Sequence, residues 1–132
     1  MLKIKSYVKV NSIEEAYELN QKKTAIVLGG MVWLKMGNRN ISTAIDLSGL
    51  GLAGIQETDE EFVIGCMTTL RELETDKRLN EYTQGAVRES VRHIVGVQFR
   101  NCATVGGSIW GRYGFSDVLT MFLGMDTWVE LH

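Results

Sequence analysis

The pattern of apolar positions changes twice in the first third of the chain, which predicts a strand, a helix and a second strand. Residues 4–10 favour a strand, because polar and apolar residues alternate over part of that run. Ser12, with Glu15 three residues later, fits a capping box at the start of a helix. The helix would bury four side chains: Ile13, Ala16, Tyr17 and Leu19. Residues 24–28 are apolar without alternation, which is typical of a strand buried on both faces. The run ends at Gly29-Gly30, so this βαβ-like unit places a Gly-Gly turn at the carboxyl end of its second strand.

The rest of the chain mixes helix and strand patterns irregularly, so we expect an α+β domain. The further strands that the sequence predicts are residues 43–47, 52–56, 61–65 and 127–131, the middle two joined by a turn at 58–60. The further helices are a short one at 31–36, one that begins at the capping box of Thr69 and Glu72, a long one over 79–95, and one over 117–124. Residues 104–108 are expected to form a glycine-rich turn beside a strand.

Composition and charge exclude several classes of protein. The 132 residues are 45% hydrophobic and 23% charged, as in an ordinary single globular domain. A net charge of -2 argues against binding to nucleic acid or to an anionic membrane. No apolar run is long enough to cross a membrane, and the first ten residues lack the apolar region of a signal peptide. We therefore expect a cytoplasmic protein.

Two cysteines are too few for a disulfide scaffold, and they do not supply a metal site by themselves. Cys66 and Cys102 are expected to be buried as small apolar side chains. No Ser/His/Asp set, Cys/His pair or pair of acidic residues at catalytic spacing is present, so the sequence predicts neither a catalytic residue nor a metal ligand.

Two clusters of small residues are candidates for binding an anion. The chain has 14 glycines and no proline, and two of the clusters are Leu28-Gly29-Gly30-Met31 and Thr104-Val105-Gly106-Gly107-Ser108. Glycines at such a position free backbone amides to approach a phosphate, and a dinucleotide has a diphosphate that two loops can enclose. A simple tight turn is the competing interpretation of each cluster. Ser116-Asp117 has two readings as well: a helix start, or a carboxylate that accepts a ribose hydroxyl.

Longer motifs identify a family that the separate clusters do not. The run from Phe99 to Ile109, followed by Phe115-Ser116-Asp117-Val118-Leu119, resembles the Arg-Asn-x-Ala-Thr-x-Gly-Gly-(Asn/Ser) … Ser-Asp signature of one family. That family is the FAD-binding medium subunits of molybdenum hydroxylases, the xanthine dehydrogenase and carbon monoxide dehydrogenase type. Val27-Leu28-Gly29-Gly30 resembles its first FAD loop, and residues 45–48 and 64–73 resemble its connecting blocks in the right order.

The resemblance implies an α+β FAD-binding fold of the vanillyl-alcohol oxidase and cresol methylhydroxylase type. A small N-terminal βαβ subdomain, residues 1–57, would pack on a larger mixed subdomain that begins at residues 58–132, with FAD between them. The residues implied to bind FAD are Val27, Leu28, Gly29, Gly30, Met31, Val32, Trp33, Leu34, Ile94, Thr104, Val105, Gly106, Gly107, Ser108 and Asp117. Of these, 27–34 and 104–108 would form the two diphosphate loops, Asp117 would lie toward the ribose, and Ile94 would line the site.

The implied function is electron transfer within a larger enzyme. FAD would take electrons from a [2Fe-2S] subunit and pass them to NAD or another acceptor, while a separate subunit with the molybdenum cofactor would carry out hydroxylation. The chain departs from the family in lacking a hydroxyl side chain after Gly29-Gly30, in having Phe115 where proline is common, and in ending at His132 before further strands of the family. The alternative hypothesis is therefore a truncated relative that does not hold FAD stably and acts as an interaction or homo-oligomeric domain.

Overall fold

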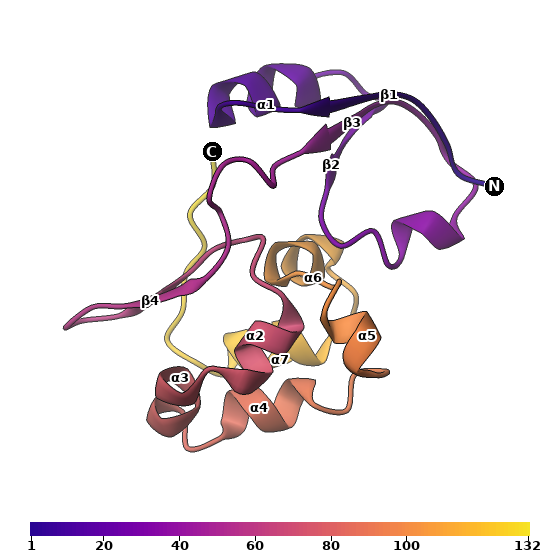
Figure 1. Cartoon of the computed structure of the whole chain (residues 1–132). Coiled ribbons are helices and arrows are strands. Elements are labelled where there is room, and N and C mark those ends of the chain that lie inside the picture. Colours follow the sequence, from indigo (N-terminus) through magenta and orange to yellow (C-terminus); the bar gives the residue numbers. More distant parts are fainter.

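The computed structural model describes residues 1–132 as two layers (Figure 1). One layer is a three-stranded sheet with one helix, built from the first 46 residues. The other layer is a bundle of short helices, and a two-stranded hairpin projects from its side. This arrangement confirms the expected mixture of helices and strands.

All three strands of the sheet are parallel, in the order β1-β3-β2. They are β1 (Lys3–Lys9), β2 (Ala25–Leu28) and β3 (Asn40–Asp46). The prediction that the strand at 24–28 is buried on both faces is wrong, because β2 lies at an edge of the sheet and Val27 stays 37% exposed. The most buried strand is the central one, β3, in which Ala44 and Ile45 have no exposed surface. Apolar runs do not say which strand is central, because that depends on long-range pairing.

Helix α1 (Ile13–Asn20) connects β1 to β2 and begins where its capping pattern predicts. The Ser12 hydroxyl accepts a hydrogen bond from the Glu15 amide, and the Glu15 carboxylate accepts one from the Asn11 amide. Only Ala16 of the four expected side chains is fully buried, and Leu19 is partly buried against the same core. Ile13 and Tyr17 are exposed, since a narrow three-stranded sheet covers only one stripe of the helix, and the Tyr17 ring instead meets His132 edge-on.

The hairpin forms as predicted but with shorter strands, β4 (Ile55–Glu57) and β5 (Phe62–Ile64), paired antiparallel. Ile55, Phe62 and Ile64 pack against the core of the helical layer. The hairpin therefore packs with the helices, although the predicted division between residues 57 and 58 falls within it.

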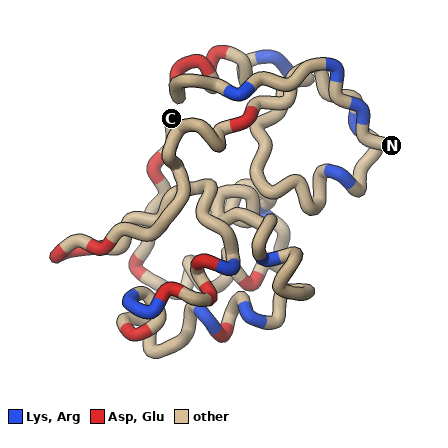
Figure 2. The backbone as a smooth tube through the Cα atoms, viewed as in Figure 1, with Lys and Arg blue, Asp and Glu red and all other residues tan.

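Charge is divided unequally between the layers. Residues 1–46 carry seven Lys or Arg and four Asp or Glu. Residues 47–132 carry seven Lys or Arg and twelve Asp or Glu. Figure 2 shows acidic residues at the tip of the hairpin and basic residues along the sheet layer. The sheet layer is thus the more positive half of the molecule.

The helical layer consists of α2 (Leu70–Thr75), α3 (Lys77–Tyr82), α4 (Ala86–Val91), α5 (Val97–Arg100), α6 (Val105–Gly111) and α7 (Asp117–Leu123). Its core joins Leu70 and Leu73 of α2, Leu79 of α3, Val87 and Val91 of α4, Ala103 and Val105 near α6, and Val118 of α7. Both predicted starts at Thr69 and Ser116 are confirmed, and the Thr69–Glu72 capping box is complete.

The single long helix predicted over 79–95 is wrong. Gln84 and Gly85 have φ values of 52° and 83°, in the left-handed region, and they reverse the chain between α3 and α4. Asn80 stabilises this turn: its side-chain amide donates to the Leu73 and Asp76 carbonyls, and its oxygen accepts from the Arg88 amide. The turn allows Leu79 and Val87 to face the same core.

The strand predicted over 127–131 is also wrong, because these residues form extended coil. Trp128 and Leu131 are exposed there, and no neighbouring strand offers the hydrogen bonds that a strand requires. None of the helices combines the length and apolar character needed to span a bilayer.

Candidate functional site

A groove of about 670 Å³ contains the predicted site residues of both layers. The sheet layer contributes the carboxyl end of β2 and the loop that leads into the 3₁₀ turn η1 (Leu34–Met36). The helical layer contributes the turn after α4 and the region from Thr104 to Val118. More than half of the lining residues are hydrophobic, a composition typical of a site for a small organic molecule.

The first glycine cluster leaves β2 and packs closely against the helical layer. Leu28 ends the strand and is buried. A side chain on Gly30 would overlap the carbonyl oxygen of Cys102, so only glycine fits at this approach. Met31 follows with φ of 58°, an unusual conformation for a residue other than glycine. The chain therefore turns sharply at the wall of the groove.

Five consecutive backbone amides of this loop, residues 29–33, are unpaired. None of them donates a hydrogen bond to a backbone carbonyl, whereas the next turn is bonded normally, with Lys35 donating to the Met31 carbonyl. All five residues line the groove. Because unpaired amides normally bind water or a ligand, this loop has the donors that an anion requires.

The second cluster does not form the predicted glycine-rich turn beside a strand. Residues 105–108 are the first turn of α6, with Thr104 as N-cap. Its amides are already paired: Val105 donates to the Thr68 carbonyl, Gly106 to the Cys66 carbonyl, Gly107 to the Thr104 hydroxyl and Ser108 to the Thr104 carbonyl. These amides are therefore not free to hold a phosphate in this conformation.

The two clusters meet at the base of the groove. A Cβ atom on Gly29 would lie 2.8 Å from the Thr104 hydroxyl oxygen and 3.7 Å from Cα of Gly107. A Cβ atom on Gly107 would lie 3.0 Å from the same hydroxyl oxygen. Glycine at both positions therefore allows the two segments to pack closely, and it leaves the groove that they line open.

Most of the residues predicted to bind FAD lie in this one groove. Those that line it are Val27, Gly29, Gly30, Met31, Val32, Trp33, Leu34, Ile94, Thr104, Gly107, Ser108 and Asp117. Leu28, Val105 and Gly106 do not: Leu28 and Val105 are buried, and Gly106 packs against Cys66, where a Cβ atom would lie 2.8 Å from the Cys66 carbonyl oxygen. Binding of FAD by these residues stays a prediction.

The structure adds groove residues that the sequence analysis did not identify. Arg39 and Arg112 line the groove, neither forms a salt bridge, and the Arg112 guanidinium lies 5.1 Å from the centre of the Trp110 ring. Tyr113 and Phe115 line it too, beside Trp33. Arg39, Arg112 and Tyr113 belong to no local motif, and Phe115 was noted only as a departure from the family signature, so their placement at the groove is what singles these residues out.

Arg100, from the recognised Arg-Asn motif, has a structural role beside the groove. Its guanidinium is buried, bonds to both carboxylate oxygens of Glu74 at 2.7 and 3.4 Å, and donates to the Ile94 carbonyl at 3.1 Å. The hydrogen bonds from Arg100, and those from Arg71, hold the pKa of Glu74 below its usual range despite partial burial. Arg100 thus fixes the turn that presents Ile94 and Val95 to the groove.

Both cysteine predictions are wrong in one respect, because Cys66 and Cys102 are exposed rather than buried. Their backbones, not their side chains, are used in packing, against Gly106 and Gly30. Partial burial nevertheless raises the pKa of the Cys66 thiol. No three His, Cys, Asp or Glu side chains gather in an arrangement that could hold a metal ion.

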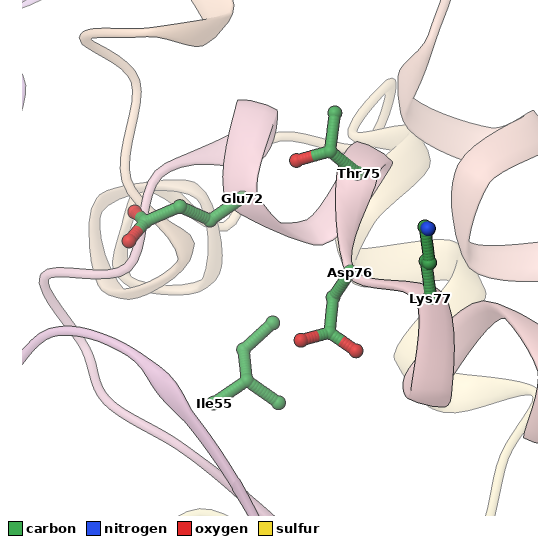
Figure 3. Close-up of a pocket in the computed structure, with 5 residues that line it drawn as sticks. All are labelled: Ile55, Glu72, Thr75, Asp76 and Lys77. Carbon is green, nitrogen blue, oxygen red and sulfur yellow. The ribbon is translucent and has the colours of Figure 1, made fainter.

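A second hollow, of about 340 Å³, lies at the junction of α2 and α3 (Figure 3). Glu72, Thr75, Asp76, Lys77 and Ile55 line it. Asp76 is already the N-cap of α3 and also pairs with Arg78. This hollow shares no residue with the groove and has no converging unpaired groups, so the groove is the candidate site.

Comparison with known proteins identifies the family to which the chain is similar. The family described as the FAD binding domain in molybdopterin dehydrogenase matches residues 2–132. A curated relative, 6-hydroxypseudooxynicotine dehydrogenase complex subunit alpha from Paenarthrobacter nicotinovorans, is 27% identical over 130 residues, which cover 93% of this chain and 44% of the relative.

Solved structures show the same fold. A crystal structure of Cu,Mo-CO dehydrogenase in its cyanide-inactivated form matches with a TM-score of 0.70 and 25% identity, covering 84% of this chain and 41% of that one. Reconstituted CO dehydrogenase from Oligotropha carboxidovorans matches with a TM-score of 0.70 and 27% identity, and the match covers 80% of this chain and 39% of that chain. Quinoline 2-oxidoreductase from Pseudomonas putida 86 shares the fold at 22% identity and a TM-score of 0.67. The match covers 79% of this chain and 38% of that chain.

The expected FAD-binding α+β fold is thereby confirmed, and the chain spans less than half the length of each of these relatives. FAD is the cofactor of the family, and the groove, with its unpaired amides and glycine contacts, fits a bound dinucleotide. Because the match extends over residues 2–132, the chain belongs to the family of FAD-binding domains in molybdopterin dehydrogenases.

Proposed function

We propose that this chain binds FAD in its groove and forms part of the electron-transfer subunit of a molybdenum hydroxylase. The observation that carries the proposal is the run of five unpaired amides, residues 29–33, at a groove that Arg39 and Arg112 also line. Backbone amides and unpaired guanidinium groups together suit the two negative charges of a diphosphate.

The groove residues would have distinct roles toward FAD. Amides 29–33 would bind the diphosphate, while Gly29 and Gly107 would allow it to approach the backbone. Asp117 would accept a hydrogen bond from a ribose hydroxyl, and Ile94, held by Arg100, would exclude water from one wall. Bound FAD would supply the redox chemistry, since no side chain of the groove does so.

The partners proposed for the complete protein are a subunit with the molybdenum cofactor and a [2Fe-2S] subunit. Support comes from the relatives, which are named as a dehydrogenase complex subunit and as a Cu,Mo-CO dehydrogenase. Electrons would pass through FAD to NAD or another acceptor, as in xanthine dehydrogenase. Two unpaired, exposed thiols suit a reducing compartment, which supports a cytoplasmic location.

The visible absorption spectrum of the purified chain tests FAD binding, before and after incubation with FAD and removal of the free cofactor. We expect retained bands near roughly 370 and 450 nm, typical of an oxidised flavin.

Gly107→Val would place a branched side chain against Thr104 and into the groove, so it should abolish FAD retention while the domain still folds. Gly124→Ala, at the end of α7 and outside the groove, is the control. Unchanged flavin content in the Gly107→Val variant would refute this location of the site.

A second candidate, a domain that no longer holds FAD and serves in assembly, has specific support of its own. The residue after Gly30 is Met31, which has no hydroxyl, and the amides at the start of α6 are paired within the protein. If the wild-type chain stays colourless after incubation with FAD, this candidate is favoured over the first.

A further inference from the structure

Three aromatic side chains from two distant segments meet at one wall of the groove. Trp33 precedes η1, whereas Tyr113 and Phe115 lie in the turn between α6 and α7. The ring centres of Tyr113 and Phe115 are 5.2 Å apart with nearly parallel planes, and Trp33 lies 5.8 and 6.1 Å from them. We call these three residues the aromatic cluster. All of them line the groove.

The aromatic cluster is exposed to a degree that packing alone does not explain. Trp33 is 50% exposed, Tyr113 43% and Phe115 69%. Rings that only joined two loops would gain most by turning their faces inward, because burial of an aromatic side chain is strongly favourable. The cluster instead presents ring surface to a groove of about 670 Å³.

The surroundings of the aromatic cluster point to a nucleotide. On one side Trp33 belongs to the loop with unpaired amides, and on the other Phe115 lies two residues before Asp117. Arg112 is adjacent to Tyr113 and forms no salt bridge. Donors for a phosphate, an acceptor for a sugar hydroxyl and an exposed ring surface are thus found together along one groove.

We propose that the aromatic cluster stacks against a planar heteroaromatic ring of the bound dinucleotide, so that ring stacking and the amides of residues 29–33 hold the two ends of one ligand segment. This inference rests on the proposed function, and it assigns to the aromatic cluster the recognition of the ligand's heteroaromatic ring. FAD has two such rings, an isoalloxazine and an adenine, and both offer the flat surface that aromatic side chains bind.

Phe115 allows the cleanest test, because it is the most exposed member and lies outside the loop of unpaired amides. Phe115→Leu keeps the apolar side chain but removes the ring, whereas Phe115→Tyr keeps the ring. Trp128→Ala removes an aromatic side chain of similar exposure, 66%, that does not line the groove. Thermal unfolding of each variant establishes that it is folded.

Isothermal titration calorimetry with FAD, FMN and ADP separates the two rings. We expect Phe115→Leu to weaken FAD binding about tenfold, while Phe115→Tyr and Trp128→Ala bind like wild type. A parallel loss for ADP assigns the stacked ring to adenine, and a parallel loss for FMN assigns it to isoalloxazine; both outcomes support the proposal.

Two results would contradict the proposal, and they distinguish failure of the stacking role alone from failure of the proposed function. If wild type binds FAD and folded Phe115→Leu binds all three nucleotides equally well, the stacking role is wrong and the proposed function stands. If wild type binds none of the three nucleotides, the proposed function fails, and the stacking role fails with it.

Discussion

Two glycine-containing segments border the groove, and they use their backbone amides differently. Amides 29–33, after β2, have no partner within the protein, whereas the amides of residues 105–108 are all bonded to Thr104, Cys66 or Thr68. In the first segment glycine leaves donors at the groove. In the second, Gly106 packs against Cys66, and Gly107 is the one of its two glycines that lines the groove.

This difference shows that similar glycine motifs support different physical roles. The first segment follows an edge strand and turns through a left-handed Met31, so no neighbouring chain is positioned to accept its hydrogen bonds. The second pairs with residues 66–70, where Leu70 also donates to the Ala103 carbonyl and Thr69 bridges Thr104. We therefore propose that the first segment binds the anion and that the second supports the fold.

Breaking the ion pair beside the second segment should have the largest effect on stability. Arg100→Met leaves the partly buried Glu74 carboxylate with Arg71 as its remaining partner, which we expect to lower the free energy of unfolding by about 3 kcal/mol, the lower end of the range for breaking a buried pair. Arg92→Met is the matched control, because its pair with Glu89 is exposed and contributes less than about 1 kcal/mol. Urea denaturation measures both.

The pH dependence of the same measurement sharpens this prediction. The folded-state pKa of Glu74 is lowered, so the pair stabilises wild type above the usual glutamate range, and that stability is lost as pH falls through the folded pKa. The gap between wild type and Arg100→Met should therefore shrink in acid. A gap that is independent of pH would show that the pair is not its cause.

Gly30→Ala tests the close contact of the first segment. The added Cβ atom would overlap the Cys102 carbonyl oxygen, and the resulting displacement should cost about 1–3 kcal/mol and lower FAD retention. Gly114→Ala, which meets no atom within 4 Å, should change stability by less than about 0.5 kcal/mol. Thermal unfolding of the two variants compares them directly; equal stabilities would contradict the contact.

Thr104→Val should have the smallest effect and probes the second segment. It removes the hydroxyl that accepts from the Gly107 amide at the start of α6, a loss of about 1 kcal/mol for a helix cap. Thr120→Val on the exposed side of α7 is the control, since its hydroxyl makes no hydrogen bond to a cap amide. If both variants unfold at the wild-type temperature, the amides of α6 do not depend on this cap.

Local hydrogen bonds explain which parts of the fold could be predicted. The helix starts at Ser12, Thr69 and Ser116 were predictable because each cap joins residues only three apart. The long helix over 79–95 and the strand over 127–131 were not, since a left-handed turn at Gln84-Gly85 and the absence of a partner strand overrode local preference. Exposure of Ile13 and Tyr17 likewise depends on how much of α1 the sheet covers.

By itself the sequence determined the family, the helix starts and the two glycine clusters, because motifs and caps are properties of neighbouring residues. Only the tertiary structure decided that β3 rather than β2 is central, that the amides of 29–33 are free while those of 105–108 are paired, and that Trp33, Tyr113 and Phe115 meet. Those features depend on contacts between segments far apart in the chain, and spacing along a sequence does not specify which distant carbonyl a given amide will reach.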